Sequence, residues 1–206
     1  KTNVLVIGGA TKGSGTNKLW ENEKINITSI DLVGTSNVDY IVDAHYLPFK
    51  KETFDAIWIQ AVLEHVVSPS SVVREIFRVI KNGGIVYSEI PFMQQIHMGK
   101  YDFTRYTGSG HRYLFKEFKT IDVGINGGPG TSLAWSIKYF IWSFTSEKLA
   151  NYLSVFLFFV LRLLDKFLSS RKSWDSSSGF YFFGTKDIRY KFDKEELNQI
   201  YKGKQN

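Results

Sequence analysis

The sequence contains no cysteine, only four prolines and only four histidines among its 206 residues. The lack of cysteine excludes disulfide bonds and thiolate chemistry, and it permits a reducing compartment. The histidines are scattered, so we expect no structural zinc site. No signal peptide is visible. Because the chain begins without methionine, directly on a predicted strand, we expect that a segment upstream of Lys1 is missing from the sequence.

Residues 1–130 have almost no net charge, because they contain 14 Lys and Arg and 13 Asp and Glu. The basic excess lies further on, and residues 131–178 hold 6 basic against 3 acidic side chains. The same segment is also the most apolar part of the chain. Basic and apolar residues together favour an anionic membrane surface as a partner, and no nucleic acid is expected.

Short apolar or alternating runs predict seven β-strands, which we place at residues 4–7, 25–31, 38–43, 54–60, 84–90, 118–124 and 179–185. Helices are expected at residues 16–23, 72–81 and 113–118, with Asn82-Gly83-Gly84 as a left-handed cap on the second. Strands that alternate with helices predict an α/β fold. We expect a doubly wound, mostly parallel seven-stranded sheet with helices on both faces.

The first predicted strand runs straight into a glycine-rich loop that contains Gly8, Gly9, Ala10, Gly13 and Gly15. Glycine permits positive φ and a close approach of backbone to ligand, so the loop predicts a nucleotide-type cofactor site, with a plain strand-to-helix turn as the alternative. Asp31 ends the second strand beside this loop. Its carboxylate can accept two hydrogen bonds from a ribose diol, although a turn or helix cap would use the same residue type.

A more specific combination of motifs follows: Asp43-Ala44, then Leu47-Pro48-Phe49, Phe54-Asp55, Gln60 to Val66 (QAVLEHV) and Lys81 to Gly84 (KNGG). On these residues the sequence resembles the class I S-adenosylmethionine-dependent methyltransferases, especially the group called type 11. The resemblance covers about residues 3–123, and strand 179–185 fits it again. It implies a Rossmann-like fold and S-adenosyl-L-methionine as the cofactor, and it implies no metal.

The resemblance also implies roles for individual residues. The glycine-rich loop would hold the methionine end of the cofactor, Asp31 with Leu32 the ribose, and Asp43 with Ala44 the adenine, while Gln60 and Glu64 would line the same site. Two positions depart from the family pattern. Val6 stands where an acid usually helps to hold the ammonium group, and Ala10 stands where a third glycine is usual. Glu64 is a candidate replacement for that acid.

Residues 91–112 follow the fifth strand and form the expected acceptor loop, because ligands bind at the carboxyl edge of open α/β sheets. His97 is a candidate general base, Asp102 would orient it, and Arg105 would bind a carboxylate or phosphate in a bidentate manner. A structural Asp102–Arg105 ion pair is the alternative. His65 is either catalytic or a polar residue lining the cofactor cleft. A similar loop pattern occurs in methyltransferase-like proteins encoded among surface-polysaccharide genes.

Residues 131–178 interrupt the domain between its last two strands. Two helical patterns, 133–144 and 149–168, are joined by a turn, and a serine-rich connector follows them. The first is too short to span a bilayer and the second is borderline and charged, so we expect a hairpin lying in one leaflet, with residues 132–170 on an anionic membrane. Its aromatic residues, Tyr139 among them, would lie at the level of the headgroups, and its basic residues, among them Arg162 and Lys166, would contact anionic lipid. A lid, a dimer or partner interface, and an ordinary internal subdomain are the alternatives.

The sequence therefore predicts a methyltransferase domain at residues 1–130 and 179–188, an inserted apolar helical hairpin at 131–178, and a charged tail at 189–206 that forms a loose amphipathic helix. The expected function is methyl transfer to an oxygen or nitrogen of a small saccharide or lipid-linked acceptor, by a cytoplasmic protein peripheral to the inner face of the cell membrane. A non-catalytic, membrane-associated scaffold of the same fold is the alternative. A NAD-type oxidoreductase is disfavoured because the glycine spacing is too loose.

Overall fold

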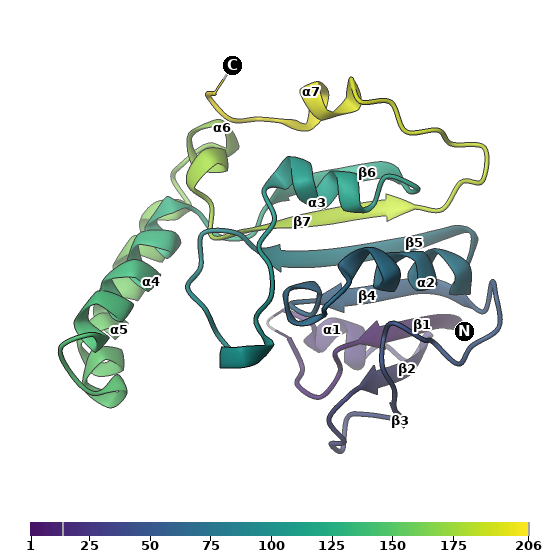
Figure 1. Ribbon diagram of the computed structural model, residues 1–206, viewed down its shortest axis with the longest axis horizontal. Helices are drawn as coiled ribbons and strands as arrows, with labels where there is room; N and C mark the ends of the chain where they lie inside the picture. Colours follow the sequence, from purple (N-terminus) through teal and green to yellow (C-terminus); the bar gives the residue numbers. More distant parts are fainter. Residues whose placement is uncertain (14, 206) are drawn as a thin grey trace.

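A seven-stranded sheet with the order β3-β2-β1-β4-β5-β7-β6 forms the centre of the computed structural model, which describes residues 1–13 and 15–205 (Figure 1). Ser14 of the glycine-rich loop lies outside the described residues. The strands are β1 (Thr2–Ile7), β2 (Ile25–Asp31), β3 (Tyr40–Ile41), β4 (Phe54–Gln60), β5 (Ile80–Pro91), β6 (Lys119–Ile125) and β7 (Gly179–Thr185). Strands β1 to β5 are parallel, and β7 lies antiparallel between β5 and β6. The predicted mostly parallel α/β sheet is confirmed.

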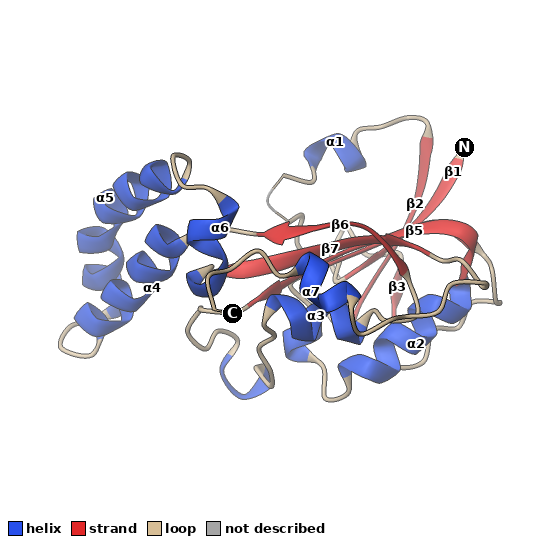
Figure 2. Cartoon of the chain, turned by 90° about the horizontal axis from the view of Figure 1, so that it is seen from above, coloured by secondary structure: helices blue, strands red, loops and turns tan. Residues whose placement is uncertain are grey.

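The helices are distributed unequally over the two faces of the sheet (Figure 2). They are α1 (Asn17–Trp20), α2 (Pro69–Val79), α3 (Gly108–Leu114), α4 (Pro129–Trp142), α5 (Glu147–Asp165), α6 (Ser170–Ser173) and α7 (Glu196–Ile200), with short 3-10 turns η1 (Leu63–His65), η2 (Gly99–Tyr101) and η3 (Trp174–Ser176). Helices α2, α3 and α7 lie over one face. The four-residue α1 lies on the other, so the helical cover of that face is much smaller than the doubly wound pattern predicts.

Side chains of the central strands alternate between the two faces, and the two sets differ as the helical cover of the faces does. Ile57, Ile59 and Val86 point to the face under α2 and α3 and are almost completely buried. The apolar stripe of α2 covers them with Val72, Val73, Ile76 and Val79. On the opposite face an aromatic row replaces helices. The ring of Tyr87 stacks on Trp58 at a centroid distance of 4.2 Å and on Tyr181 at 6.1 Å.

Two predicted helix boundaries are wrong. Helix α2 ends at Val79, and Ile80 is already extended and pairs with Phe54, so Asn82-Gly83-Gly84 is not its cap. Strand pairing is favoured over a longer helix here because it buries both Ile80 and Phe54. Gly83 does have positive φ, +79°, but within the irregular start of β5. The helix predicted at 113–118 is α3, which begins five residues earlier because the Thr107 side chain accepts the Gly110 N–H at 3.1 Å and caps it.

Other predicted elements are present but shorter. The first crossover helix covers only α1, and the third strand only β3. In the tail only α7 is helical, so the predicted amphipathic helix is mostly wrong. The tail is instead held by Arg112, whose buried guanidinium donates to Tyr190 Oη at 2.6 Å and Glu196 Oε2 at 3.3 Å. Such tertiary contacts override a weak local propensity.

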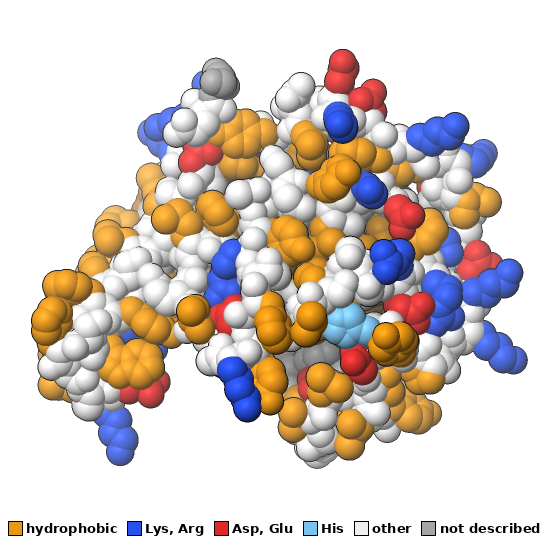
Figure 3. All heavy atoms as spheres, viewed as in Figure 1, with side chains coloured by type: hydrophobic (Ala, Val, Ile, Leu, Met, Phe, Trp, Pro, Cys, Tyr) orange, Lys and Arg blue, Asp and Glu red, His pale blue; other side chains and the backbone are white. Residues whose placement is uncertain are grey.

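The insert forms an antiparallel pair, α4 and α5, that projects from the end of the sheet between β6 and β7 (Figures 1 and 2). Small buried residues, Ala134, Ala150 and Ser154, let the helices approach each other. The outer surface is strongly apolar (Figure 3), with Phe156 73% and Phe167 80% exposed. In the part of the chain that the structure describes, no helix is long and apolar enough to cross a membrane.

Candidate active site

The glycine-rich loop packs directly against the carboxyl ends of its own sheet. Gly8 has a φ of +84°, and a Cβ there would come within 2.2 Å of a methyl carbon of Val62. A Cβ on Gly13 would come within 2.1 Å of Gln60 Oε1. Gly15 also has a φ of +84° but has open space around it. Glycine is therefore required in this loop both by backbone conformation and by the close approach to β4.

Asp31 connects the end of β2 to this loop. Its Oδ2 accepts the N–H of Ala10 at 3.0 Å, its Oδ1 accepts that of Val33 at 2.9 Å, and Gly9 lies between, donating to the Ile30 carbonyl at 3.1 Å. Each carboxylate oxygen has a second lone pair, so these bonds leave capacity for a ribose diol. Leu32 is 67% exposed beside it. A fixed carboxylate next to an exposed apolar side chain fits the adenosine part of a nucleotide-type cofactor.

The Asp43-Ala44 pair lies just after β3. The Asp43 carboxylate accepts the backbone N–H of His45 at 2.9 Å and approaches its Nδ1 at 2.6 Å, and these bonds lower the pKa of Asp43. Ala44 is buried and Ile41, at the end of β3, is exposed. Asp43 is thus partnered by His45, while Leu32 and Ile41 supply exposed apolar surface at the same edge.

A cluster of two histidines and one glutamate lies where β4 and β5 end. The η1 turn positions Glu64 and His65, and the loop after β5 supplies His97. The Nε2 atoms of the two histidines are 3.1 Å apart. Glu64 Oε1 lies 3.7 Å from His65 Nε2 and 3.5 Å from His97 Nε2. Glu64 is fully buried, and this neighbouring carboxylate raises the pKa of His97. The sequence expectation placed these residues in two separate roles, whereas the structure brings them together.

Asp102 and Arg105 form a bidentate ion pair within the acceptor loop. Arg105 also donates to the carbonyls of Gln94 at 3.1 Å and Thr104 at 2.8 Å. Burial acts to raise the pKa of Asp102, but the hydrogen bonds from Arg105 and from the His97 backbone N–H outweigh it, and the pKa is lowered. The geometry favours the structural ion pair over an Arg105 that is available to an acceptor.

Glu89 near the end of β5 is a site residue that the sequence interpretation missed. Its carboxylate accepts from Gln60 Nε2 at 2.9 Å, from Asn126 Nδ2 at 2.5 Å and from the Tyr87 hydroxyl. Burial and the hydrogen bond to Glu89 raise the pKa of Tyr87. A signal was available, because Glu89 is the one charged residue in the predicted strand 84–90 and lies at its carboxyl end.

A cavity of about 690 Å³ opens between this sheet edge and the base of the hairpin. Gln60, Glu64 and Glu89 line it from the strand ends, His97 from the acceptor loop, and Arg162, Asp165 and Lys166 from α5. Arg162 and Lys166 were interpreted from the sequence as contacts for anionic lipid. The structure instead places both at the cavity, because the end of α5 returns to the start of α4, where Asp165 accepts the N–H groups of Gly130 and Thr131.

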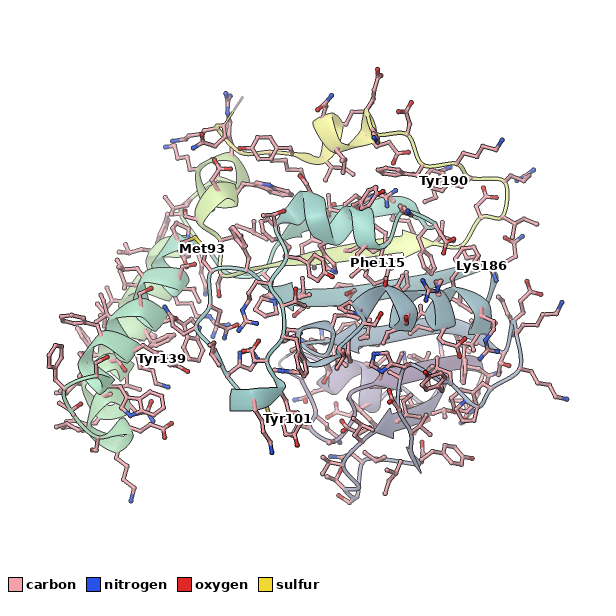
Figure 4. The ribbon with its side chains drawn as sticks, viewed as in Figure 1. Met93, Tyr101, Phe115, Tyr139, Lys186 and Tyr190 are labelled. Carbon is pink, nitrogen blue, oxygen red and sulfur yellow. The ribbon has the colours of Figure 1, made fainter. Side chains whose placement is uncertain are left out.

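The hairpin also holds the loop that carries His97 (Figure 4). The hydroxyl of Tyr139 on α4 donates to the Ile96 carbonyl at 2.7 Å, and Gln95 Nε2 donates to Ser136 Oγ at 3.0 Å. Tyr139 was expected at the level of lipid headgroups. Its hydroxyl instead fixes the position of His97 relative to the cavity.

Residues 8–88 match the family described as "Methyltransferase domain". No curated protein matches the sequence. Among solved structures, the chain is similar to the cyclase SpnF (16% identity, 91% of this chain and 75% of that one, TM-score 0.57). It is also similar to an S-adenosylmethionine-dependent methyltransferase from Methanosarcina mazei (16% identity, 91% of this chain and 93% of that one, TM-score 0.53).

A third similar structure is a Haemonchus contortus phosphoethanolamine N-methyltransferase 2 bound to phosphomonomethylethanolamine and S-adenosylhomocysteine (14% identity, 90% of this chain and 49% of that one, TM-score 0.55). At these identities the likeness establishes the Rossmann-like fold, and the domain match covers residues 8–88 of the chain. The match of residues 8–88 to a methyltransferase domain supports S-adenosylmethionine as the cofactor, as the sequence predicts.

Proposed function

We propose that the protein transfers a methyl group from S-adenosylmethionine to an oxygen or nitrogen of a small saccharide or lipid-linked acceptor at an anionic membrane surface. The observation that carries this proposal is the cavity of about 690 Å³, which meets the cofactor edge at Gln60 and the apolar hairpin at α5. When bound, S-adenosylmethionine supplies a methyl group activated by its positive sulfur. The protein then has to align the acceptor and manage its proton.

His97 is the side chain placed to accept that proton, because it lines the cavity and is only partly exposed. Asp102 accepts the backbone N–H of His97 at 2.8 Å and so holds it in position. We do not propose Arg105 as an acceptor-binding group, since its donors are used within the loop. Arg162 and Lys166 line the opposite wall and suit an acceptor that carries phosphate or carboxylate.

The membrane part of the proposal is supported by the exposed aromatic surface of the hairpin beside the cavity. Phe156, Phe159 and Phe167 are each at least 67% exposed. A monomer rarely exposes so much contiguous apolar surface without a partner. An anchored acceptor would then reach the cavity from the membrane side, which fits a peripheral protein on the inner face. The resemblance of the acceptor loop to proteins encoded among surface-polysaccharide genes supports a saccharide acceptor.

Calorimetric titration with S-adenosylmethionine tests the cofactor half of the proposal. We expect Asp31→Ala to weaken binding at least about tenfold, because a charge-assisted hydrogen bond contributes roughly 1.5–3 kcal/mol. Asp187→Ala is the matched control, since Asp187 follows β7 at the opposite edge of the sheet and its loss should leave binding unchanged. Absence of binding by the intact protein would contradict the proposal.

A non-catalytic scaffold is the second candidate, and one observation favours it. Val6 occupies the position where the family carries an acid, and it is 5% exposed, so it presents no charge to the cofactor. A scaffold of this kind would transfer no labelled methyl group to lipid-linked saccharides. An enzyme would transfer the label and lose the transfer in the Asp31→Ala variant.

A further inference from the structure

The carboxylate of Glu64 is the least satisfied charged group at the site. It is completely buried, and neither of its oxygens has a hydrogen-bond partner among the described residues. An unpaired buried carboxylate is costly, and proteins normally compensate it with a donor, a counter-charge or a metal ion. Glu64 Oε1 faces the Nε2 atoms of His65 and His97, so the compensating group must lie among these three atoms.

The spacing of the three atoms matches the ligand shell of one divalent ion. Their mutual distances are 3.1, 3.5 and 3.7 Å. Metal–nitrogen and metal–oxygen bonds of about 2.0–2.2 Å, at angles between octahedral and tetrahedral, require ligand atoms roughly 3.0–3.5 Å apart. The cluster therefore needs shifts of only a few tenths of an ångström, roughly, to hold an ion.

The hydrogen bonding of His65 sets the tautomer that a metal needs. The Nδ1 atom of His65 lies 2.8 Å from the backbone carbonyl of Tyr101 in η2 (Figure 4). Because a carbonyl oxygen can only accept a hydrogen bond, Nδ1 carries the proton. The lone pair of Nε2 is therefore directed at the cluster. A backbone carbonyl behind a ligating histidine is the usual second-shell arrangement. His97 is held in turn by Asp102, through the backbone hydrogen bond described above.

We propose that Glu64, His65 and His97 bind a divalent transition-metal ion, with its open coordination positions facing the cavity. Two imidazoles and one carboxylate select Zn²⁺, Fe²⁺ or Co²⁺ over Mg²⁺ and Ca²⁺, which prefer oxygen ligands. The inference deepens the proposed function and rests on it only for the acceptor: an ion here favours an acceptor that binds through oxygen. Because a nitrogen that ligates an ion cannot also accept a proton, metal binding and the base role assigned to His97 above are alternatives, and the titration below distinguishes them. The metal site itself stands independently of methyl transfer.

Titration of untagged, chelator-treated protein with Co²⁺, followed by its visible absorption and by competition with Zn²⁺, tests the site without cofactor or acceptor. We expect one ion per chain, displaced by Zn²⁺ and not by Mg²⁺. Glu64→Gln, His65→Gln and His97→Gln should each weaken binding by more than the roughly 10- to 100-fold seen when second-shell groups are removed. Circular dichroism checks that each variant is folded.

His45→Gln is the matched control, because His45 also lies beside a carboxylate, Asp43, but outside the cluster. Its Co²⁺ affinity should equal that of the wild type. The proposal is overturned if no stoichiometric binding occurs, or if folded Glu64→Gln and His97→Gln proteins bind as tightly as the wild type. In that case the histidines only share a proton. Calorimetric titration with S-adenosylmethionine tests the proposed function separately. A failure of the metal site can therefore be distinguished from a failure of the proposed methyl transfer.

Discussion

The environments of the four histidines show how much the surroundings determine the chemistry of one residue type. His45 pairs with Asp43 near the surface, and His65 and His97 face each other at the cavity. His111 is buried in the core, with its Nε2 2.9 Å from Ser88 Oγ, and burial lowers its pKa to about 3. His111 is therefore neutral in the folded protein at neutral and mildly acidic pH.

This neutrality makes stability depend on pH. Unfolded His111 binds a proton below about pH 6.5, whereas the folded side chain does not, so the unfolded state takes up more protons. The contribution of neutral His111 to the free energy of unfolding is complete above pH 6.5. It is lost as the pH falls toward 3, at up to about 1.4 kcal/mol per pH unit. Urea unfolding of wild type and His111→Gln between pH 5 and 7 should show a flatter dependence in the variant. Equal slopes for wild type and His111→Gln would refute the assignment.

At the scale of elements, the hairpin is defined by its caps. The Ser146 side chain accepts the Leu149 N–H at 3.3 Å and starts α5, as the predicted turn requires. The start of α4 has a cap from a distant residue instead. Asp165, at the end of α5, accepts the N–H groups of Gly130 at 2.7 Å and Thr131 at 2.8 Å. The N-terminus of one helix is thus tied to the C-terminus of the next.

Asp165→Ala should therefore loosen the base of the hairpin. Loss of an N-cap costs about 1 kcal/mol, so amide hydrogen exchange in the first turn of α4 should accelerate roughly fivefold. Asp165→Asn keeps an acceptor and should recover part of the protection. Asn151→Ala, an exposed change in the second turn of α5, is the control and should leave the first turn of α4 unaffected. Unchanged exchange in Asp165→Ala would show that the cap does not stabilise α4.

At the scale of the whole molecule, the cofactor edge, the cavity and the hairpin form one continuous surface. The strand ends hold the predicted cofactor residues, the cavity follows, and α5 closes it with Arg162 and Lys166. The hairpin then extends an exposed apolar surface away from the sheet (Figure 3). Whatever covers that surface, whether lipid, a partner or a second copy, will lie next to the cavity.

The proposed membrane contact predicts that the intact protein co-sediments with vesicles containing anionic lipid, less strongly at high salt. Phe156→Ser combined with Phe159→Ser should reduce binding at least about tenfold, because a buried phenylalanine contributes roughly 1.5–3 kcal/mol. Tyr46→Ser, an exposed change outside the hairpin, is the control. If sedimentation is unaffected by the double substitution while analytical ultracentrifugation shows that it dissociates a dimer, the surface is an interface between copies.

The sequence by itself determined where most strands lie along the chain, the glycine-rich loop and the position of Asp31, because these depend on local periodicity and on the backbone freedom of glycine. Strands β2, β4 and β7 lie where the alternation of apolar residues predicts them. The boundaries of α2 and α3 could not be predicted, since Ile80 gains more from pairing with Phe54 and Thr107 caps a helix without strong periodicity.

Only the tertiary structure decided which distant residues share a site. His65 and His97 are separated by 32 positions, and Glu89 and Asn126 by 37, so no spacing in the sequence joins them. It also moved Arg162 and Lys166 from an expected lipid contact to the wall of the cavity. The physical reason is common to these cases. A periodic pattern tells which side of an element is buried, but the packing of one element on another determines which polar side chains meet.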